Sequence, residues 1–434
     1  GGAVAATAAG GLDGRAVAHR AGGRAVQVER LPRVETFSIG HNAAEPTLGV
    51  TAEGDVFYAA ADPTTLVPPL PVDIMRSTDG GQTWEVKSPQ LAGNNVHAST
   101  GDPYVYVDRT RAGARVFTVD LQGYACSVLS FSDDGGDSWV TNPLGCGRPV
   151  NDHQTVFAGP PVESSTLGYP HVVYYCYHDT VTSSCTKSLD GGITFVPTGE
   201  PSYTAYTESG EFCGGLHGHG FAGPDGTVYI PKGHCGVPVL AISKDEGASW
   251  TRVEVAKLPS AGHEASVAAD KRGNVFYAYI GIDMLPYLVV SRDGGSTWGR
   301  PMMVGRPGVV EASLPSVDAG KRGLVVVGYM GTRDRGDDDY SKVAWDGYVT
   351  STRNPLARRP LFYSTSVNEP GDPLIRGECP QTKCGPEYDF IDVVVAPDDT
   401  VWAAFVDGCV ALCSETFGPN DAYAGIASHI RVPR

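Results

Sequence analysis

Long apolar runs and an excess of positive charge are both missing from this sequence of 434 residues. No apolar run approaches the roughly 20 residues that a membrane-spanning helix needs, so membrane insertion is not expected. Lysine and arginine number 33 against 49 aspartates and glutamates, which gives a formal net charge of −16. Because an acidic surface repels nucleic acid and anionic lipid, we expect neither as a partner. The sequence leaves the oligomeric state open.

The twin Cys-x-x-Cys spacing of a zinc ribbon is also absent. The ten cysteines instead fall into five local pairs, each able to close a hairpin or a short loop: Cys126/Cys146, Cys176/Cys185, Cys213/Cys235, Cys379/Cys384 and Cys409/Cys413. Disulfides persist in oxidising compartments, so the pairs predict five disulfides in a secreted, extracellular protein. The alternative is a set of free buried thiols in a cytosolic protein.

An internal repeat is the strongest signal in the chain. Five segments share the pattern Ser-x-Asp-x-Gly-x-Ser/Thr-aromatic, and their aspartates are Asp79, Asp134, Asp190, Asp245 and Asp293. The fourth segment carries Glu246 where the others have glycine. Successive aspartates lie 55, 56, 55 and 48 residues apart, the length of one four-stranded propeller blade.

These five segments resemble the Asp boxes (BNR repeats) of sialidases and their relatives, and the motifs span about residues 45 to 300. The resemblance implies a β-propeller with the boxes at its outer rim. The aspartate of each box can accept hydrogen bonds from backbone N–H groups of its own turn, and glycine there supplies a positive φ. We therefore expect a structural role for all five aspartates.

A second pattern also indicates the blades: polar residues lead into a short apolar strand. This pattern occurs seven times. It predicts an all-β, seven-bladed propeller over residues 25–434, with the six blades usual in sialidases as the alternative. Residues 1–24 are rich in alanine and glycine and predict a flexible leader. We expect the ring to close by pairing of a strand near residues 25–31 with the last strand, 427–432, which removes open sheet edges.

The polar strand starts should converge at one mouth of the channel, because the first strand of each blade lines a propeller's axis. The predicted catalytic residues there are Asp152, His153, His219, Glu264 and Glu311. The predicted substrate-binding residues are Glu45, Asp102, His217, His263 and Asp392. A slip of one residue would turn each of these side chains to the other face of its strand.

Several chemistries fit such a cluster. Carboxyl groups with shifted pKa values could cleave a glycosidic bond, or a neutral histidine could abstract the C5 proton of a uronic acid. Histidines and carboxylates could also bind a metal. A solvated polar channel without chemistry is the remaining interpretation. No cofactor is required, although Asp337, Asp338 and Asp339 form an acidic loop that could bind Ca²⁺.

The resemblance implies sialidase activity, but the arginine motif of those enzymes is matched poorly by Arg30-Leu31-Pro32, and we carry no arginine triad over. We expect a secreted enzyme that cleaves glycosidic bonds at the central mouth, as a sialidase-like glycoside hydrolase or a polysaccharide lyase. The alternative is an extracellular propeller that only binds glycans or proteins, for example as a subunit of an assembly.

Overall fold

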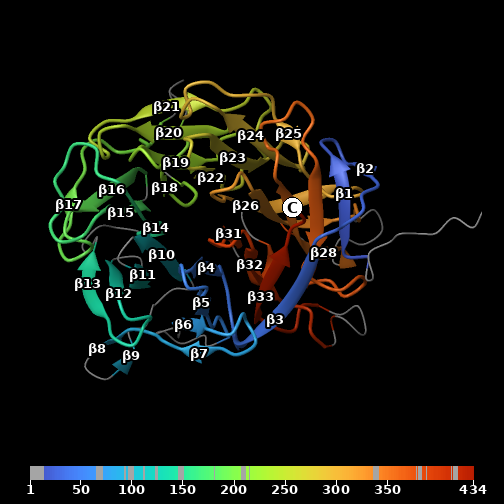
Figure 1. The fold of residues 1–434 in the computed structure, drawn as a ribbon, viewed down its shortest axis with the longest axis horizontal. Coiled ribbons are helices and arrows are strands. Elements are labelled where there is room, and N and C mark those ends of the chain that lie inside the picture. Colours follow the sequence, from blue (N-terminus) through green and yellow to red (C-terminus); the bar gives the residue numbers. More distant parts are fainter. Residues whose placement is uncertain are drawn as a thin grey trace, which may run out of the picture.

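The chain forms a ring of β-sheets around a central channel (Figure 1). This computed structural model describes residues 14–64, 72–91, 94–95, 102–110, 113–122, 126–144, 151–179, 181–206, 212–214, 216–335, 342–377, 379, 384–387, 389–411, 413 and 419–434. Within these residues, six four-stranded sheets and one larger sheet follow one another around the axis. The predicted all-β propeller is confirmed. No helix in the described part of the chain is long and apolar enough to span a membrane.

Five sheets are antiparallel meanders that repeat in chain order. Their strands, from the channel outwards, are β4 (Thr47–Val50), β5 (Val56–Ala61), β6 (Val72–Ser77) and β7 (Glu85–Val86); β10 (Tyr104–Thr110), β11 (Gly113–Gln122), β12 (Cys126–Ser132) and β13 (Val140–Leu144); β14 (Asp152–Gly159), β15 (Val172–His178), β16 (Ser183–Ser188) and β17 (Val196–Pro197); β18 (Phe221–Ala222), β19 (Val228–Lys232), β20 (Val239–Ser243) and β21 (Thr251–Glu254); β22 (Ser266–Ala269), β23 (Val275–Ile280), β24 (Pro286–Ser291) and β25 (Met302–Met303). A small hairpin of β8 (Gln90–Leu91) and β9 (Asn94–Asn95) precedes β10.

The other two sheets receive strands from the N-terminal region. One contains β26 (Glu311–Ala319), β27 (Val325–Thr332), β28 (Ala344–Thr352), β29 (Phe362–Ser366) and β30 (Ile375–Arg376), extended at its outer edge by β1 (Ala16–Arg20) and β2 (Arg24–Val26). The last contains β31 (Asp392–Val395), β32 (Val401–Asp407) and β33 (Ala424–Arg431), with β3 (Arg33–Asn42) as its outermost strand. A 3-10 turn, Gly385–Glu387, precedes β31.

Two expectations about the N-terminal region are wrong. Residues 16–20 form β1, which pairs with β29, so this part of the expected leader is sheet; residues 1–13 lie outside the described residues. Ala18 and His19 of β1 are buried, because small and flat side chains fit between the neighbouring strands. The ring closes through β3, which begins at Arg33 opposite Arg431, and not through residues 25–31. Figure 1 shows β1 and β3 along the outside of their sheets.

The Asp boxes lie at the turns between the third and fourth strands, on the outer rim as expected. In the first box, the Oδ1 atom of Asp79 accepts the Thr83 N–H at 2.9 Å and its Oδ2 atom accepts the Thr83 hydroxyl at 2.6 Å. The Ser77 hydroxyl oxygen accepts the Gly81 N–H at 2.9 Å. The other four boxes repeat this bonding. These aspartates therefore hold turns and lie away from the channel.

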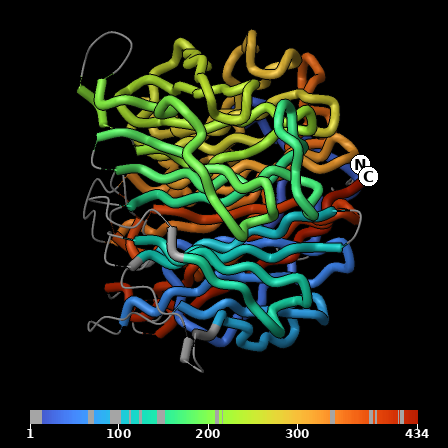
Figure 2. Tube along the Cα trace, turned by 90° about the vertical axis from the view of Figure 1, so that its left-hand side faces the viewer, coloured from blue at the N-terminus to red at the C-terminus, as the bar shows by residue number. Residues whose placement is uncertain are grey.

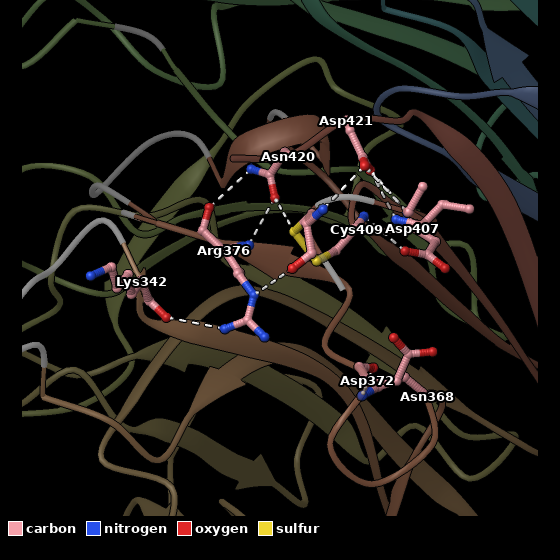
Figure 3. Close-up of a disulfide and its surroundings, with 11 residues drawn as sticks. Lys342, Asn368, Asp372, Arg376, Asp407, Cys409, Asn420 and Asp421 are labelled. Atoms are coloured by element: carbon pink, nitrogen blue, oxygen red, sulfur yellow. Dashed lines mark hydrogen bonds between the residues drawn. A yellow bond between two sulfur atoms is a disulfide. The ribbon is translucent and has the colours of Figure 1, made fainter. Parts of the chain in front are cut away.

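Four of the five predicted disulfides are present: Cys176–Cys185, Cys213–Cys235, Cys379–Cys384 and Cys409–Cys413. Cys146, the predicted partner of Cys126, lies outside the described residues. Figure 3 shows the Cys409–Cys413 turn, where Arg376 donates to the Cys413 carbonyl at 3.1 Å and Asp421 accepts the Cys413 N–H at 3.1 Å. These bonds fix the connection between β32 and β33.

Apolar clusters fill the spaces between neighbouring sheets, where strands of adjacent sheets interlock. One cluster joins the last two sheets and includes Trp345 and Phe405, both fully buried. The innermost strands approach very closely: a Cβ atom at Gly49 of β4 would lie 2.5 Å from the Val107 side chain of β10. In Figure 2, turned by 90° from Figure 1, the strands run across the width of the ring.

Candidate active site at one mouth of the channel

The innermost strands β4, β10, β14, β18, β22, β26 and β31 are in contact in this order, and β31 contacts β4 again. Each begins at the same end of the channel, because every sheet is an antiparallel meander that starts at the axis. We call this end the strand-start mouth and the other end the far opening. Most of the sequence-predicted site residues lie at the strand-start mouth.

Glu264 is the centre of a buried charged group at this mouth. Its Oε1 atom lies 2.9 Å from Nε2 of His234 and 3.6 Å from Nδ1 of His153. Burial alone would raise the pKa of Glu264, but the hydrogen bond from His234 and the charge of His153 hold it below its ordinary value. Burial alone would lower the pKa of His153, and the negative charge of Glu264 raises it instead. Each partner therefore favours the charged form of the other, the carboxylate of Glu264 and the imidazolium of His153.

An acidic group lies next to this pair. Burial, followed by the charges of Asp102 and Asp389, raises the pKa of Glu45 well above its ordinary value. Glu45 shares a hydrogen bond with Asp102, and its Oε1 atom accepts the Asp389 N–H at 3.3 Å. Asp152 adds a further negative charge close to Glu45 and to His153. The surroundings therefore favour the protonated form of Glu45 and the ionised form of Glu264.

Neutral histidines surround the charged ones. Burial lowers the pKa of His217 and of His219 to about 3, and that of His178 and of His263 to about 4. The His217 carbonyl lies 2.9 Å from Nδ1 of His153, so the segment of His217 orients that ring. The Nε2 atom of His217 and the Nε2 atom of His263 are buried without a hydrogen-bond partner among the described residues.

His219 presents its ring to the channel. It stacks on Phe390 with ring centres 4.3 Å apart and meets the edge of Tyr104 at 4.7 Å. His219, Glu264, Asp389 and Phe390 line a cavity of about 10 Å³, enough for roughly one water molecule. The Oε2 atom of Glu264 is buried without a partner among the described residues.

The backbone is strained at this mouth. Glu45, His153 and Leu314 have positive φ angles of 45°, 49° and 52°, which non-glycine residues adopt at a cost. Strand β14 also has a bulge between Asp152 and Thr155, and β26 has one between Ser313 and Ser316. Such irregularities set the direction of individual side chains at functional sites.

Three further predicted site residues do not line the mouth cavity. Glu311 begins β26 opposite Thr332, at the same end of the channel, and its meeting with His153, His219 and Glu264 stays a prediction. His263 contacts Ser313 at 3.3 Å on the side of the mouth. Asp392 lies further along the channel, where it accepts the Leu48 N–H at 3.0 Å, and burial raises its pKa to about 7.

Sequence reasoning did not assign His234 and Phe390 to the site. His234 lies in the turn between β19 and β20, which the Cys213–Cys235 disulfide ties to the segment before His217. The sequence signal for His234 is its position next to Cys235, which is predicted to form a disulfide with Cys213. Phe390 lies in the connection before β31, and no motif marks it.

No group of three metal-ligating side chains is arranged to hold a metal ion in the part of the chain that the structure describes. The calcium candidates Asp337, Asp338 and Asp339 lie outside the described residues.

Comparison with known proteins supports a distant relationship. The family model described as "BNR/Asp-box repeat" matches residues 75–86. The comparison with curated proteins gave no match. Together with the five boxes, the family match makes the chain a distant relative of the Asp-box, sialidase-like propellers.

Solved structures of similar fold include a protein of unknown function from Dyadobacter fermentans, with 15% identity and a TM-score of 0.47 over 93% of this chain and 99% of that one. The Hadza microbial sialidase Hz136 shares 16% identity with a TM-score of 0.47 over 70% and 68%. The Aleuria aurantia lectin bound to α-methyl-L-fucoside shares 12% identity with a TM-score of 0.48 over 77% and 97%.

Proposed function

We propose that this protein is an extracellular enzyme that hydrolyses glycosidic bonds at the strand-start mouth. One observation carries the proposal: two carboxyl groups of the same mouth have pKa values shifted in opposite directions. The pKa of Glu45 is raised by burial and by neighbouring carboxylates, while hydrogen bonding to His234 lowers that of Glu264 despite its burial. Glycoside hydrolysis needs such a pair, with one protonated acid and one ionised base or nucleophile.

The roles follow from the surroundings of each group. Glu264 lines the mouth cavity, which has room for the attacking water, and can accept a proton from that water. Glu45 is the general acid that gives its proton to the leaving oxygen, and it accepts the backbone N–H of Asp389, a residue that lines the same cavity. The water oxygen bonds to the anomeric carbon as the glycosidic bond breaks. One water proton moves to Glu264, the other stays on the new hydroxyl, and the proton of Glu45 moves to the leaving oxygen. His219 stacks beside this cavity and can accept a hydrogen bond from a substrate hydroxyl.

Elimination is supported less well. A lyase needs a base that removes the C5 proton of a uronic acid, and His219 is the histidine that lines the cavity. Its pKa of about 3 leaves it neutral at pH 7 but only weakly basic, since burial disfavours the imidazolium. Hydrolysis by the carboxyl pair is therefore the better supported reaction.

The test is a screen of plant, algal and bacterial glycans for new reducing ends and for absorbance at 235 nm, with the unmodified protein and its Glu264→Gln variant. We expect reducing ends without absorbance, and their loss in the variant. Glu254→Gln, on outer strand β21, is the matched control and should keep full activity. Equal activity of the Glu264→Gln variant would contradict the proposal, and a rise at 235 nm would favour elimination.

A glycan-binding propeller without catalysis is the second candidate. The mouth cavity holds about one water molecule and not a sugar, and the aromatic pair Tyr206 and Phe212 is exposed at 60% and 68% beside the Cys213–Cys235 disulfide. Exposed aromatic rings stack on sugar faces. Retention of the protein on a glycan array without any release of reducing ends would favour this candidate.

We further propose that each sheet of four or more strands is one blade, which makes the propeller seven-bladed. The innermost strands of the seven sheets contact one another in a closed series, which supports this number, whereas the Aleuria aurantia lectin is described as six-bladed. The extracellular location is supported by the disulfides, because these bonds persist in oxidising compartments. An experimental structure of the secreted protein would test both points.

A further inference from the structure

The channel itself is a second, larger cavity, which shares His219, Ser266 and Ser316 with the small one at the mouth. It has a volume of about 480 Å³, within the range of small-molecule sites. Its walls are the innermost strands, and its residues extend from His219 and Asp392 to the turns at the far opening. The proposed hydrolytic site does not use these turns.

One of these turns is unusually long. Between β14 and β15 the chain forms a loop of residues 160–171, whereas residues 270–274 suffice between β22 and β23. The loop carries Tyr169 and His171 to Asp108 of β10: the Tyr169 hydroxyl donates to the Asp108 carboxylate at 2.6 Å, and Nδ1 of His171 lies 2.8 Å from it. Asp108 is buried and raises the pKa of His171. His171 itself lines the channel cavity.

Glu246, the irregular residue of the fourth Asp box, anchors this loop. Its Oε1 atom accepts the N–H groups of Val162, Glu163 and Ser164 at 2.8, 3.0 and 3.0 Å. Its Oε2 atom accepts the Lys187 ammonium at 2.7 Å and the Ser164 hydroxyl. Glu246 keeps the positive φ of 57° that the glycines of the other boxes have, and its side chain is fully buried. The departure from the box pattern therefore positions the loop that carries His171.

Cationic donors at the far opening have few hydrogen-bond partners among the described residues. Lys271 and Lys321 line the cavity and form no hydrogen bond or ion pair with described residues, and Arg109 donates only to the Val395 carbonyl at 3.5 Å. The carboxylates that line the cavity all accept hydrogen bonds: Asp108 as above, Asp270 from the Arg272 and Asn274 N–H groups, Asp318 from the Ala319 and Val395 N–H groups, and Asp392 from the Leu48 N–H group.

We propose that the far opening is a binding site for a small organic anion, with its carboxylate held by Lys271, Lys321, Arg109 and the free Nε2 edge of His171. A carboxylate supplies further acceptors for these donors, and charge-assisted hydrogen bonds of this kind are strong.

Titration calorimetry with D-glucuronate tests the site, with D-glucose and sodium sulfate as further titrants. We expect glucuronate to bind in the low millimolar range or tighter and glucose not to bind. The double variant Lys271→Gln/Lys321→Gln should weaken glucuronate binding at least tenfold. Lys244→Gln/Lys257→Gln removes the same charge from exposed positions outside the channel and is the matched control. Sulfate binding as tight as that of glucuronate would mean that the site recognises anionic charge alone.

Two variants separate this site from the proposed hydrolytic site. Glu264→Gln should leave glucuronate binding unchanged, because Glu264 belongs to the other mouth. His171→Asn keeps a donor towards Asp108 but removes the second ring nitrogen, and should weaken binding several-fold. Absence of glucuronate and sulfate binding, or unchanged binding in the lysine double variant, would overturn the proposal.

Discussion

The two ends of the channel use polar side chains in opposite ways. At the strand-start mouth, Glu45, His153 and Glu264 are buried, and the cavity that Glu264 lines has a volume of about 10 Å³. At the far opening, Lys271 and Lys321 are exposed and line a cavity of about 480 Å³. Buried ionisable groups that interact with one another have defined protonation states, which acid and base catalysis requires. Exposed donors without partners can instead bind a ligand. Reactivity and affinity should therefore respond to different substitutions.

The largest effect is expected at the strand-start mouth. Glu264→Gln and His219→Ala should each lower turnover on the order of a hundredfold or more, because they remove the base and the ring beside the reacting atoms. Thermal unfolding of both variants should stay close to that of the unmodified protein. Near-normal turnover in both, once a substrate is known, would refute their roles.

The Cys213–Cys235 disulfide should matter for stability and for the mouth. It closes a separation of 22 residues and ties the turn of His234 to the segment before His217. Replacing both cysteines with serine should destabilise the protein by about 2–4 kcal/mol and lower turnover. The Cys409–Cys413 disulfide closes a separation of only 4 residues, so the Cys409→Ser/Cys413→Ser variant should lose less stability. Denaturant unfolding measures both variants, and free thiols found by non-reducing mass mapping would contradict the premise.

Glu246→Gly tests how the far opening is built. The variant has the residue found in the other four boxes, so the positive φ costs nothing, but three loop N–H groups lose their acceptor. We expect a loss of about 1–3 kcal/mol and weaker glucuronate binding, with turnover at the other mouth unchanged. Isothermal titration and chemical unfolding give the readouts. A stable variant with full affinity would show that the loop holds its position without Glu246.

A smaller effect concerns Asp392, midway along the channel. Burial raises its pKa to about 7 from an ordinary 3.8, so the folded protein binds a proton that the unfolded chain has lost. Its contribution to stability is therefore full below about pH 4 and is lost as the pH rises to about 7. Asp392→Asn should remove this decline, with a difference in Tm of about 2–4 °C between pH 4 and 8. Parallel pH profiles of the two proteins would contradict the assignment.

Much of the architecture follows from local sequence. Each Asp box closes its own turn through contacts within seven residues, so Asp79 and its four equivalents predict the blade period and the outer rim. Four described disulfides link cysteines that are near one another in the chain, which is why simple pairing predicts them.

The site was predictable only in part. The polar strand starts do converge, since innermost strands must meet at the axis, and His153, His219 and Glu264 are found there. The positive φ of His153 and the bulges in β14 and β26 could not be predicted, because alternation along a strand assumes regular backbone. His234 was not assigned because it lies in the turn between β19 and β20 and not at a strand start.

What the sequence by itself determined is the set of local units: the box turns, the short disulfide loops and the alternation of strands. Only the tertiary structure decided how distant segments join: β1 on the sheet of β29, β3 on the sheet of β33, and Glu246 on the loop of His171. Local units depend on hydrogen bonds within a few residues, which a sequence pattern records. Pairing between distant segments depends on which strand edges and hydrogen-bonding groups are still unpaired in the closed ring. No short sequence motif records this.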